Sequence, residues 1–189
     1  MRAVPRRKFV PAGTLLFGDL DDPHPIGHGQ TISQTSLVEW MTELLELEPG
    51  DRVLEVGTGS GYQAAVLAAL GYVDVYSLEI VPELAQAAAE RLRRLGYGAV
   101  HLRQGDGYEG WPEFAPYQGI VVTAATSQVP PALGEQLAEG GHLVIPLGPP
   151  GFSQMLRQYV KQGVRLTGRD ICSVAFVPFT RGGAHADNR

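Results

Sequence analysis

Residues 53–61 read VLEVGTGSG and place a carboxylate, Glu55, two positions before a glycine-rich turn. Glycines between a strand and a helix let a ligand approach the backbone closely, with helical N–H groups facing it. Dinucleotide sites have the spacing G-x-G-x-x-G, whereas Gly57, Gly59 and Gly61 follow G-x-G-x-G. This form suits a ligand with an ammonium and a sulfonium group and no phosphate, because Glu55 can face its positive end. The run predicts S-adenosylmethionine binding through Glu55, Gly57 and Gly59; a purely structural turn and a nicotinamide site are the alternatives.

Further polar groups follow later strands at the same expected edge. Glu79 ends the next strand, where nucleotide-binding α/β folds place a carboxylate that accepts hydrogen bonds from ribose hydroxyls. Asp106 can accept a hydrogen bond from an adenine amino group, and its flanking glycines, among them Gly107, leave room for the ring. Residues 123–125 are expected to form the floor of the site. The alternatives are an exposed strand-end charge, an ordinary Asp-Gly turn and a plain strand end.

Hydrophobic periodicity indicates the elements that must position these residues. An apolar stripe at i, i+4, i+7 and i+8 from Leu37 predicts a helix that follows Ser33 and ends at Pro49-Gly50. The other expected elements are strands at 52–56, 74–78, 99–102, 119–123 and 142–147 and helices at 62–70 and 82–95. This alternation predicts a mostly parallel sheet with helices on both faces, a Rossmann-like doubly wound α/β fold.

We expect one domain over residues 1–189, since a chain of this length with 44% hydrophobic residues can bury a sizeable core. Residues 1–32 are rich in Pro, Gly and His and are expected to form a strap near the site. Residues 149–180 are expected to form antiparallel strands. Residues 181–189 have the composition of a flexible polar tail.

Composition narrows the partners and the location. The net charge of −5 argues against a general nucleic-acid binder, and no run approaches the ~18 apolar residues of a membrane span. The basic stretch 2–8 lacks the apolar core of a signal peptide, so we expect a cytoplasmic protein. A single cysteine, Cys172, excludes an internal disulfide framework and a cysteine-based zinc cluster, and we expect an inert thiol and no metal site. Thirteen arginines against two lysines, with Asn188 as the sole asparagine, fit a thermophilic source or a GC-rich genome.

Passages outside the glycine loop carry a resemblance to a known family. The most specific is QTISQ at residues 30–34, because general methyltransferases share the glycine loop but not this run. The other passages are FVP at 9–11, PIG at 25–27, MTELL at 41–45, residues 52–63, GDGY at 105–108, GW at 110–111 and residues 140–146. From about Arg6 to Thr180 the chain resembles the protein-L-isoaspartate O-methyltransferases.

The resemblance implies an enzyme of protein repair, which transfers a methyl group from S-adenosylmethionine to the free carboxylate of L-isoaspartyl residues in damaged proteins and peptides. It implies that Ser33 is the catalytic residue, beside the transferred methyl group. It also implies cofactor contacts at Gln30, Thr31, Ile32, Ser33, Ser60, Glu79, Asp106, Gly107 and, near the C-terminus, Thr180.

Methyl transfer from a sulfonium to a carboxylate is a direct displacement. The acceptor has a pKa near ~4 and is already ionised at neutral pH, so no general base is required. We therefore expect Ser33 to align the acceptor by a hydrogen bond; the alternative is a helix N-cap. His24 and His28 are interpreted as surface or packing residues. Pairing of the substrate backbone with an edge strand would hold the peptide.

The chain departs from the family pattern in three places. Thr35 replaces a proline after the Ser-Gln pair and is expected to loosen the start of the helix. Gln118 replaces an aspartate before the fourth strand, which affects a local contact there. An N-terminal helix of many relatives has no counterpart before Arg6, with an expected effect on peptide grip or oligomerisation.

Two other functions remain open from the sequence. A methyltransferase acting on a small molecule or a nucleic acid would share Glu55, Glu79 and Asp106, but it leaves residues 30–33 unexplained. A non-catalytic cofactor-binding module is supported only by Gln118 and the short N-terminus.

Overall fold

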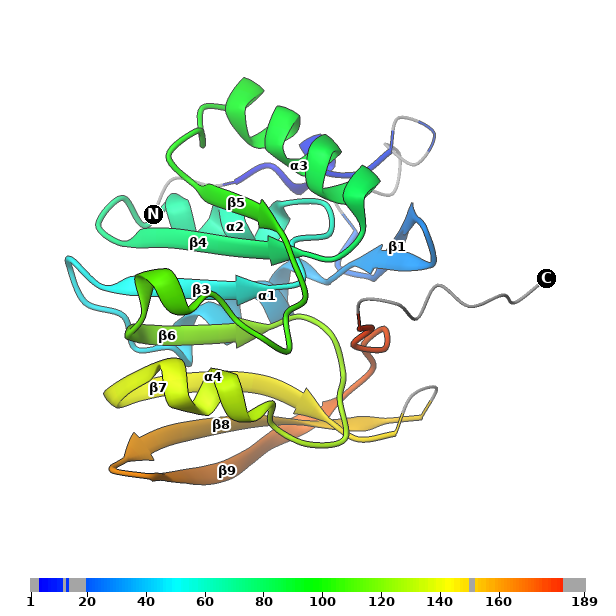
Figure 1. Cartoon of the computed structure of the whole chain (residues 1–189). Helices are drawn as coiled ribbons and strands as arrows, with labels where there is room; N and C mark the ends of the chain where they lie inside the picture. The colour runs from blue at the N-terminus through cyan, green and yellow to red at the C-terminus, as the bar shows by residue number, and fades with distance from the viewer. Residues whose placement is uncertain (1–3, 12, 14–19, 150–151, 182–189) are drawn as a thin grey trace.

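The computed structural model describes residues 4–11, 13, 20–149 and 152–181 (Figure 1). One seven-stranded sheet has the order β5-β4-β3-β6-β7-β8-β9. Its strands are β3 (Arg52–Val56), β4 (Asp74–Glu79), β5 (His101–Gln104), β6 (Tyr117–Val122), β7 (Leu137–Leu147), β8 (Gln154–Gln162) and β9 (Arg165–Val174). The helices are α1 (Thr35–Glu43), α2 (Tyr62–Ala68), α3 (Pro82–Arg94) and α4 (Pro131–Gln136), with 3-10 turns at Arg6–Lys8 and Pro112–Phe114. A separate hairpin pairs β1 (His24–Gly27) with β2 (Gln30–Ile32).

The order in which the chain adds strands to the sheet reverses beside β3. From β3 the chain adds β4 and β5 on one side in parallel, then returns to add β6 and β7 on the other side, also in parallel. The antiparallel meander β7-β8-β9 completes the sheet. Ligands of open α/β sheets bind outside the carboxyl ends of the strands at such a switch point, which here lies between β3 and β6. The predicted doubly wound fold and its antiparallel C-terminal element are confirmed.

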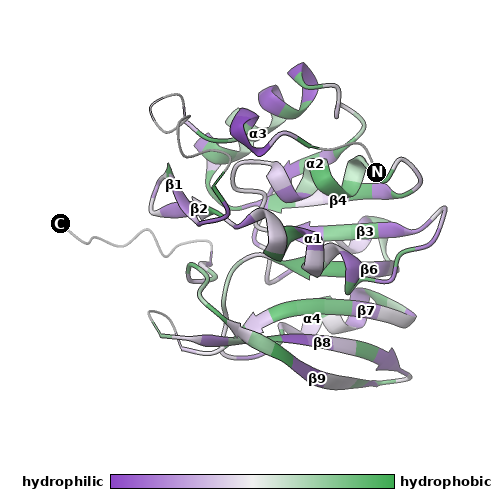
Figure 2. Ribbon diagram, turned by 180° about the vertical axis from the view of Figure 1, so that it is seen from behind, coloured by the Kyte–Doolittle hydropathy of each residue, from purple (hydrophilic) through white to green (hydrophobic). Residues whose placement is uncertain are grey.

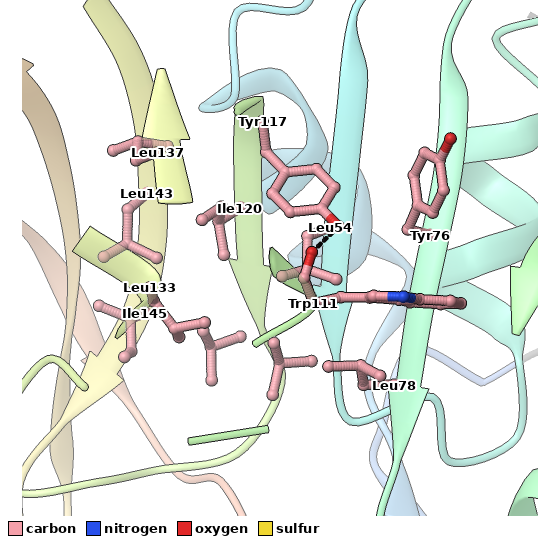
Figure 3. Close-up of a cluster of buried hydrophobic side chains, with 12 residues drawn as sticks. Leu54, Tyr76, Leu78, Trp111, Tyr117, Ile120, Leu133, Leu137, Leu143 and Ile145 are labelled. Atoms are coloured by element: carbon pink, nitrogen blue, oxygen red, sulfur yellow. Dashed lines mark hydrogen bonds between the residues drawn. The ribbon is translucent and has the colours of Figure 1, made fainter. Parts of the chain in front are cut away.

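Alternate side chains of β3 enter two different cores, as the period of a strand requires. Val53 packs with residues of α1 and α2 on one face, which α1, α2 and α3 cover (Figure 2). Leu54 and Val56 face the other side, which α4 and an aromatic cluster cover. In that cluster the buried hydroxyl of Tyr117 donates to the carbonyl oxygen of Trp111 at 2.6 Å (Figure 3). Right-handed crossovers in opposite directions explain why helices occupy both faces.

Some element boundaries differ from the sequence prediction. β7 begins at Leu137, five residues before the expected start, because the glycines that suggest a turn form an irregularity within the strand, with Gly140 at φ 73°. The hairpin β1–β2 and helix α4 were not predicted, since neither is long enough to show a period. Of the expected tail, only Arg181 lies within the described residues. In the described part of the chain, no helix has the length and apolarity to cross a membrane.

Candidate active site at the carboxyl edge of the sheet

Three cavities meet at Thr31 and Thr123, which line all three. Cavity A lies over the ends of β3 and β4 and is closed by residues 177–180. Cavity B lies beside the glycine loop and reaches Glu55. Cavity C lies between α1 and the end of β9 and has a volume of about 500 Å³. The crossover of the sheet thus gathers groups from several separate stretches of the chain.

Eleven of the twelve residues predicted for the site line cavity A or cavity B. Cavity A receives Gln30, Thr31, Gly57, Gly59, Glu79, Gly107 and Thr180. Cavity B receives Thr31, Ile32, Ser33, Glu55, Gly57, Gly59 and Ser60. Asp106 lines neither cavity, although Gly105 and Gly107 on both sides of it line cavity A. The individual contacts of these residues with a cofactor remain predictions.

The glycine loop is held by backbone and side-chain hydrogen bonds. Gly57 has φ 100°, and a Cβ atom there would collide with the hydroxyl of Thr123, which donates to the Gly57 carbonyl oxygen at 2.6 Å. Gly59 has φ 52° and donates its N–H to Glu79 Oε2 at 2.7 Å. A side chain at Gly57 would therefore break the loop both through strain and through collision.

Glu79 is 5% exposed and accepts one backbone N–H on each carboxylate oxygen. Oε2 accepts from Gly59, and Oε1 accepts from Val81 at 2.9 Å. Each oxygen of a carboxylate has two acceptor positions, so both keep capacity for a further donor in cavity A. This arrangement suits a pair of ribose hydroxyls.

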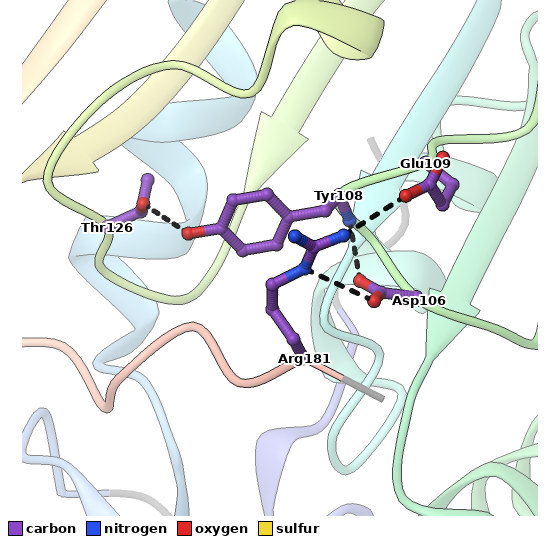
Figure 4. Close-up of polar contacts among 5 residues, drawn as sticks. All are labelled: Asp106, Tyr108, Glu109, Thr126 and Arg181. Atoms are coloured by element: carbon purple, nitrogen blue, oxygen red, sulfur yellow. Dashed lines mark hydrogen bonds and ion pairs between the residues drawn. The ribbon is translucent and has the colours of Figure 1, made fainter. Parts of the chain in front are cut away.

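The loop after β5 is joined to the C-terminal segment by a cation (Figure 4). Arg181 lies over the ring of Tyr108, 4.6 Å from its centroid, and pairs with Glu109 at 3.1 Å and with Asp106 Oδ2 at 3.6 Å. Asp106 Oδ1 accepts the backbone N–H of Tyr108 at 2.9 Å. The hydroxyl of Tyr108 shares a 2.8 Å hydrogen bond with Thr126. Asp106 is thus occupied by protein groups, and its predicted adenine contact uses only its remaining acceptor positions.

Gly107 stands where two side chains converge on the backbone. A Cβ atom there would collide with Val56 Cγ1 and would lie 2.9 Å from Phe179 Cζ. The ring of Phe179 also packs on Tyr108, with centroids 4.5 Å apart. Only glycine therefore lets the C-terminal segment lie this close to the end of β3.

Ser33 is positioned through its backbone. Arg6 is 3% exposed and donates from Nε to the Ser33 carbonyl oxygen at 3.0 Å. The same guanidinium donates to the carbonyl oxygens of Leu20 at 2.7 Å and Asp22 at 2.6 Å. The hydroxyl of Ser33 has no hydrogen bond within the described part of the chain and lines both cavity B and cavity C. It is therefore placed to bind a ligand.

α1 begins at Thr35. The N-cap position is Gln34, which gives no side-chain cap, so the alternative interpretation of Ser33 as the cap is wrong. Asp21 supplies the cap from the strap, since its Oδ1 accepts the N–H of Ser36 at 3.1 Å. Hydrogen bonding to Ser36 also lowers the pKa of Asp21 below its ordinary value.

Gln118, near the start of β6, forms a hydrogen bond with the neighbouring strand β3. Its Oε1 accepts the N–H of Arg52, the first residue of β3, at 2.8 Å. This contact lies at the amino ends of β3 and β6, opposite the edge that carries the cavities. The departure at Gln118 therefore lies away from the site.

Glu55 is fully buried. Its Oε2 accepts the hydroxyl of Ser77 at 2.5 Å, and its Oε1 has no partner. Burial raises the pKa of Glu55 to about 8. The Ser77 hydrogen bond lowers this pKa, the nearby charge of Glu79 raises it, and the backbone N–H of Ala64 lowers it by a smaller amount. A group with this pKa is mostly protonated at neutral pH, so the expectation of an anionic Glu55 is corrected for the ligand-free protein.

Sequence reasoning missed several residues of the site. Arg6 appeared only as part of a basic stretch, because nothing in the sequence shows that it is buried. Residues 177–179 line cavity A beside the predicted Thr180, but a short apolar segment carries no signal of its own. Gln63 lines cavity B from the first turn of α2, where periodicity indicates only a helix.

The sheet order, the glycine loop without a phosphate spacing and the strand-end carboxylate Glu79 define a Rossmann-like methyltransferase of the S-adenosylmethionine-dependent class. Within that class, the chain belongs to the family of protein-L-isoaspartate(D-aspartate) O-methyltransferases, whose family model matches residues 1–184. The predicted family, fold and enzyme class are confirmed.

Relatives and solved structures agree with this assignment. A protein-L-isoaspartate O-methyltransferase of Opitutus terrae is 54% identical over 181 residues, which cover 96% of this chain and 77% of the relative. One from Gloeobacter violaceus is 48% identical and is covered to 88%. A solved protein-L-isoaspartate O-methyltransferase superposes with a TM-score of 0.85 at 32% identity, over 95% of this chain and 59% of that chain. A structure from Plasmodium falciparum, described as a putative member in complex with S-adenosyl-L-homocysteine, has a TM-score of 0.77 at 26% identity and covers 94% of this chain and 86% of that one.

Proposed function

We propose that this protein transfers a methyl group from S-adenosylmethionine to the free carboxylate of L-isoaspartyl residues in damaged proteins and peptides. The observation that carries the proposal is the position of Ser33, which lines both the small polar cavity B and the large cavity C. A residue that aligns an acceptor with a methyl donor must lie where the sites of the two ligands meet.

Cavities A and B together suit the cofactor. Glu79 in cavity A offers acceptors to the ribose, and the unpartnered Glu55 Oε1 in cavity B offers one to the amino-acid end. Cavity A has a volume of only about 60 Å³, far below the ~300 Å³ or more of a typical ligand site. Entry of an adenosine therefore requires the segment 177–181 or the strap to move outward.

Cavity C suits the acceptor. Among the described residues that line it, none carries a charge, and Ser33, Ser36 and Ser153 contribute hydroxyls. An acceptor carboxylate held by neutral hydrogen bonds stays a better nucleophile than one paired with a cation. Residues 172–176 form one wall, where β9 is the edge strand of the sheet. We propose that the peptide backbone is held along this edge.

When bound, S-adenosylmethionine supplies an electrophilic methyl group. The protein then has to align the acceptor and exclude water, because the ionised carboxylate needs no general base. Ser33 orients the carboxylate through its free hydroxyl, and Arg6 holds the backbone of Ser33 in place. Neither His24 nor His28 lines any of the three cavities, which agrees with a reaction that uses no base.

The test is transfer of a labelled methyl group to an isoaspartyl peptide and to the same peptide with normal aspartate. We expect methylation of the first and background for the second, because a shift of about 1 Å in the acceptor costs ~100-fold in rate. The rate should not rise between about pH 6 and 8 through acceptor ionisation. Equal rates for both peptides would refute the substrate, and a tenfold rise per pH unit would refute the base-free mechanism.

We also propose a cytoplasmic location and partners that are damaged proteins and peptides, without nucleic acid or membrane. The net charge of −5 argues against a general nucleic-acid binder.

A further inference from the structure

Cavity B contains two buried oxygen acceptors without partners, Glu55 Oε1 and Gln63 Oε1. Buried polar atoms are paired in the great majority of cases, so two in one cavity of about 40 Å³ require an explanation. That space suits a group about the size of one water molecule.

The orientation of Gln63 is set by its neighbours. Its Nε2 donates to Thr42 Oγ1 at 2.8 Å, and Thr42 uses its own proton on the carbonyl oxygen of Val38 at 2.8 Å. A flipped amide would place an oxygen against Thr42, which has no second proton to give. The amide oxygen of Gln63 is therefore the atom left over.

The orientation of Glu55 is set in the same way. Ser77 donates to Glu55 Oε2, and the hydroxyl of Thr58 lies 2.5 Å from Ser77. Since Ser77 gives its one proton to Glu55, Thr58 must donate to Ser77. Oε2 is thus an acceptor, and any proton that Glu55 carries resides on the unpartnered Oε1.

We propose that Glu55 and Gln63 form one buried receptor for the α-ammonium group of the cofactor, and that Glu55 gives up a proton to solvent when this group binds. The proposal rests on the cofactor assigned under the proposed function. An ammonium group brings donors and no acceptor, which is what two orphaned oxygens require. Its positive charge favours the ionised carboxylate, so the proton leaves as the ligand enters.

The surroundings of Glu55 agree with this exchange. On this face of the sheet α1 contributes Val38, Met41 and Thr42, and Thr123 follows the end of β6; none of these side chains titrates in this range. α2 adds Tyr62, whose pKa burial raises above its ordinary value, and β4 adds Glu79. Glu79 is the only other carboxylate that acts on Glu55 in the described structure, and burial raises the pKa of Glu55 to about 8. The protein therefore supplies no cation to neutralise Glu55.

Titration calorimetry of S-adenosyl-L-homocysteine at pH 7, in two buffers of different ionisation heat, measures the protons released on binding. We expect roughly one proton for the wild-type protein, because a group with a pKa near 8 is mostly protonated at this pH. 5′-Methylthioadenosine carries the nucleoside but no ammonium and should release almost none. Glu55→Gln should abolish the release with S-adenosyl-L-homocysteine. No release by the wild type, or equal release by Glu55→Gln, would overturn the proposal.

Gln63→Met tests the second acceptor. We expect about tenfold weaker binding of S-adenosyl-L-homocysteine and unchanged binding of 5′-methylthioadenosine, since only the first presents an ammonium to the missing oxygen. Gln86→Met, on the exposed surface of α3, is the matched control. Equal weakening of both ligands would show a merely structural role for Gln63 and overturn its part in the receptor. Failure of both ligands to bind the wild-type protein would refute the proposed cofactor itself.

Discussion

The guanidinium carbon of Arg181 lies 4.6 Å from the centre of the Tyr108 ring, and this contact joins the C-terminal segment to the loop that carries Asp106. The segment it holds includes Phe179 and Thr180, which line cavity A. Cavity A must widen to admit a cofactor. We therefore interpret the contact of Arg181 with Tyr108 as one that stabilises the closed position of the segment 177–181.

Arg181→Met should make S-adenosyl-L-homocysteine dissociate roughly three- to tenfold faster. The change removes a cation–π contact and exposed ion pairs that together contribute about 1 kcal/mol. Stopped-flow displacement measures the rate. Arg157→Met is the matched control, since Arg157 pairs with Asp170 and lies over Tyr159 away from the cavities. Equal dissociation rates for the two variants would exclude this role for Arg181.

Glu79→Gln should weaken the binding of S-adenosyl-L-homocysteine and 5′-methylthioadenosine alike, by at least about tenfold. The variant keeps the shape of the side chain but loses an acceptor and the charge that strengthens hydrogen bonds to ribose. Glu83→Gln removes an equal charge from the exposed first turn of α3 and serves as the control in the same calorimetric titration. Unchanged affinity for both ligands would remove Glu79 from the site.

Ser33→Ala should lower the turnover number roughly tenfold and leave the affinity for S-adenosyl-L-homocysteine within a few fold. The hydroxyl acts on the acceptor in the transition state and not on the cofactor in the ground state. Because Ser33 does not cap α1, the melting temperature should stay close to that of the wild type. Ser127→Ala, outside the three cavities, controls for loss of a hydroxyl. A normal turnover would contradict the catalytic role.

Arg6→Lys should lower turnover and melting temperature together. A lysine ammonium cannot reach the several carbonyl oxygens that the planar guanidinium of Arg6 spans, so part of the Ser33 backbone support is lost. Arg93→Lys, at an exposed position of α3, should change neither quantity. Thermal melting and the peptide methylation assay measure the two effects. A variant as active and as stable as the wild type would show that the Arg6 hydrogen bonds to the backbone are not required.

The free energy of unfolding should fall as the pH rises from about 4.5 to 8, because Glu55 holds a proton more tightly in the folded protein than in the unfolded chain. Burial raises its pKa to about 8 from an ordinary 4.5, so in this window the folded protein keeps a proton that the unfolded chain has lost. The contribution is complete below pH 4.5 and is lost as the pH rises to 8, with a slope of at most about 1.4 kcal/mol per pH unit. Urea unfolding at several pH values should show a flatter profile for Glu55→Gln. Parallel profiles would mean that Glu55 is ionised in the folded protein.

Much of the architecture could be predicted from local pattern. The strand 52–56 and the helix start at Pro82 coincide with the structure, because an apolar run before a glycine turn and a proline at a first helical position are local signals. Acidic and glycine residues at strand ends predicted which residues share one edge, since parallel strands bring their carboxyl ends together. Glu55, Gly57, Gly59, Glu79 and Gly107 line cavities A and B for this reason. The other predicted residues that line them, at 30–33, 60 and 180, were implied by the family resemblance and not by strand ends.

Burial and long-range contact could not be predicted in this way. The sequence by itself determined that Glu55 precedes the glycine loop. Only the tertiary structure decided that Glu55 is enclosed by α1, α2 and β4, which raises its pKa, and that Gln63 lines the same cavity. The same holds for Arg6, whose partners at Leu20 and Ser33 lie 14 and 27 residues away. Local sequence specifies the backbone conformation of a segment, whereas the state of an ionisable group depends on the solvent and charges that distant segments remove or supply.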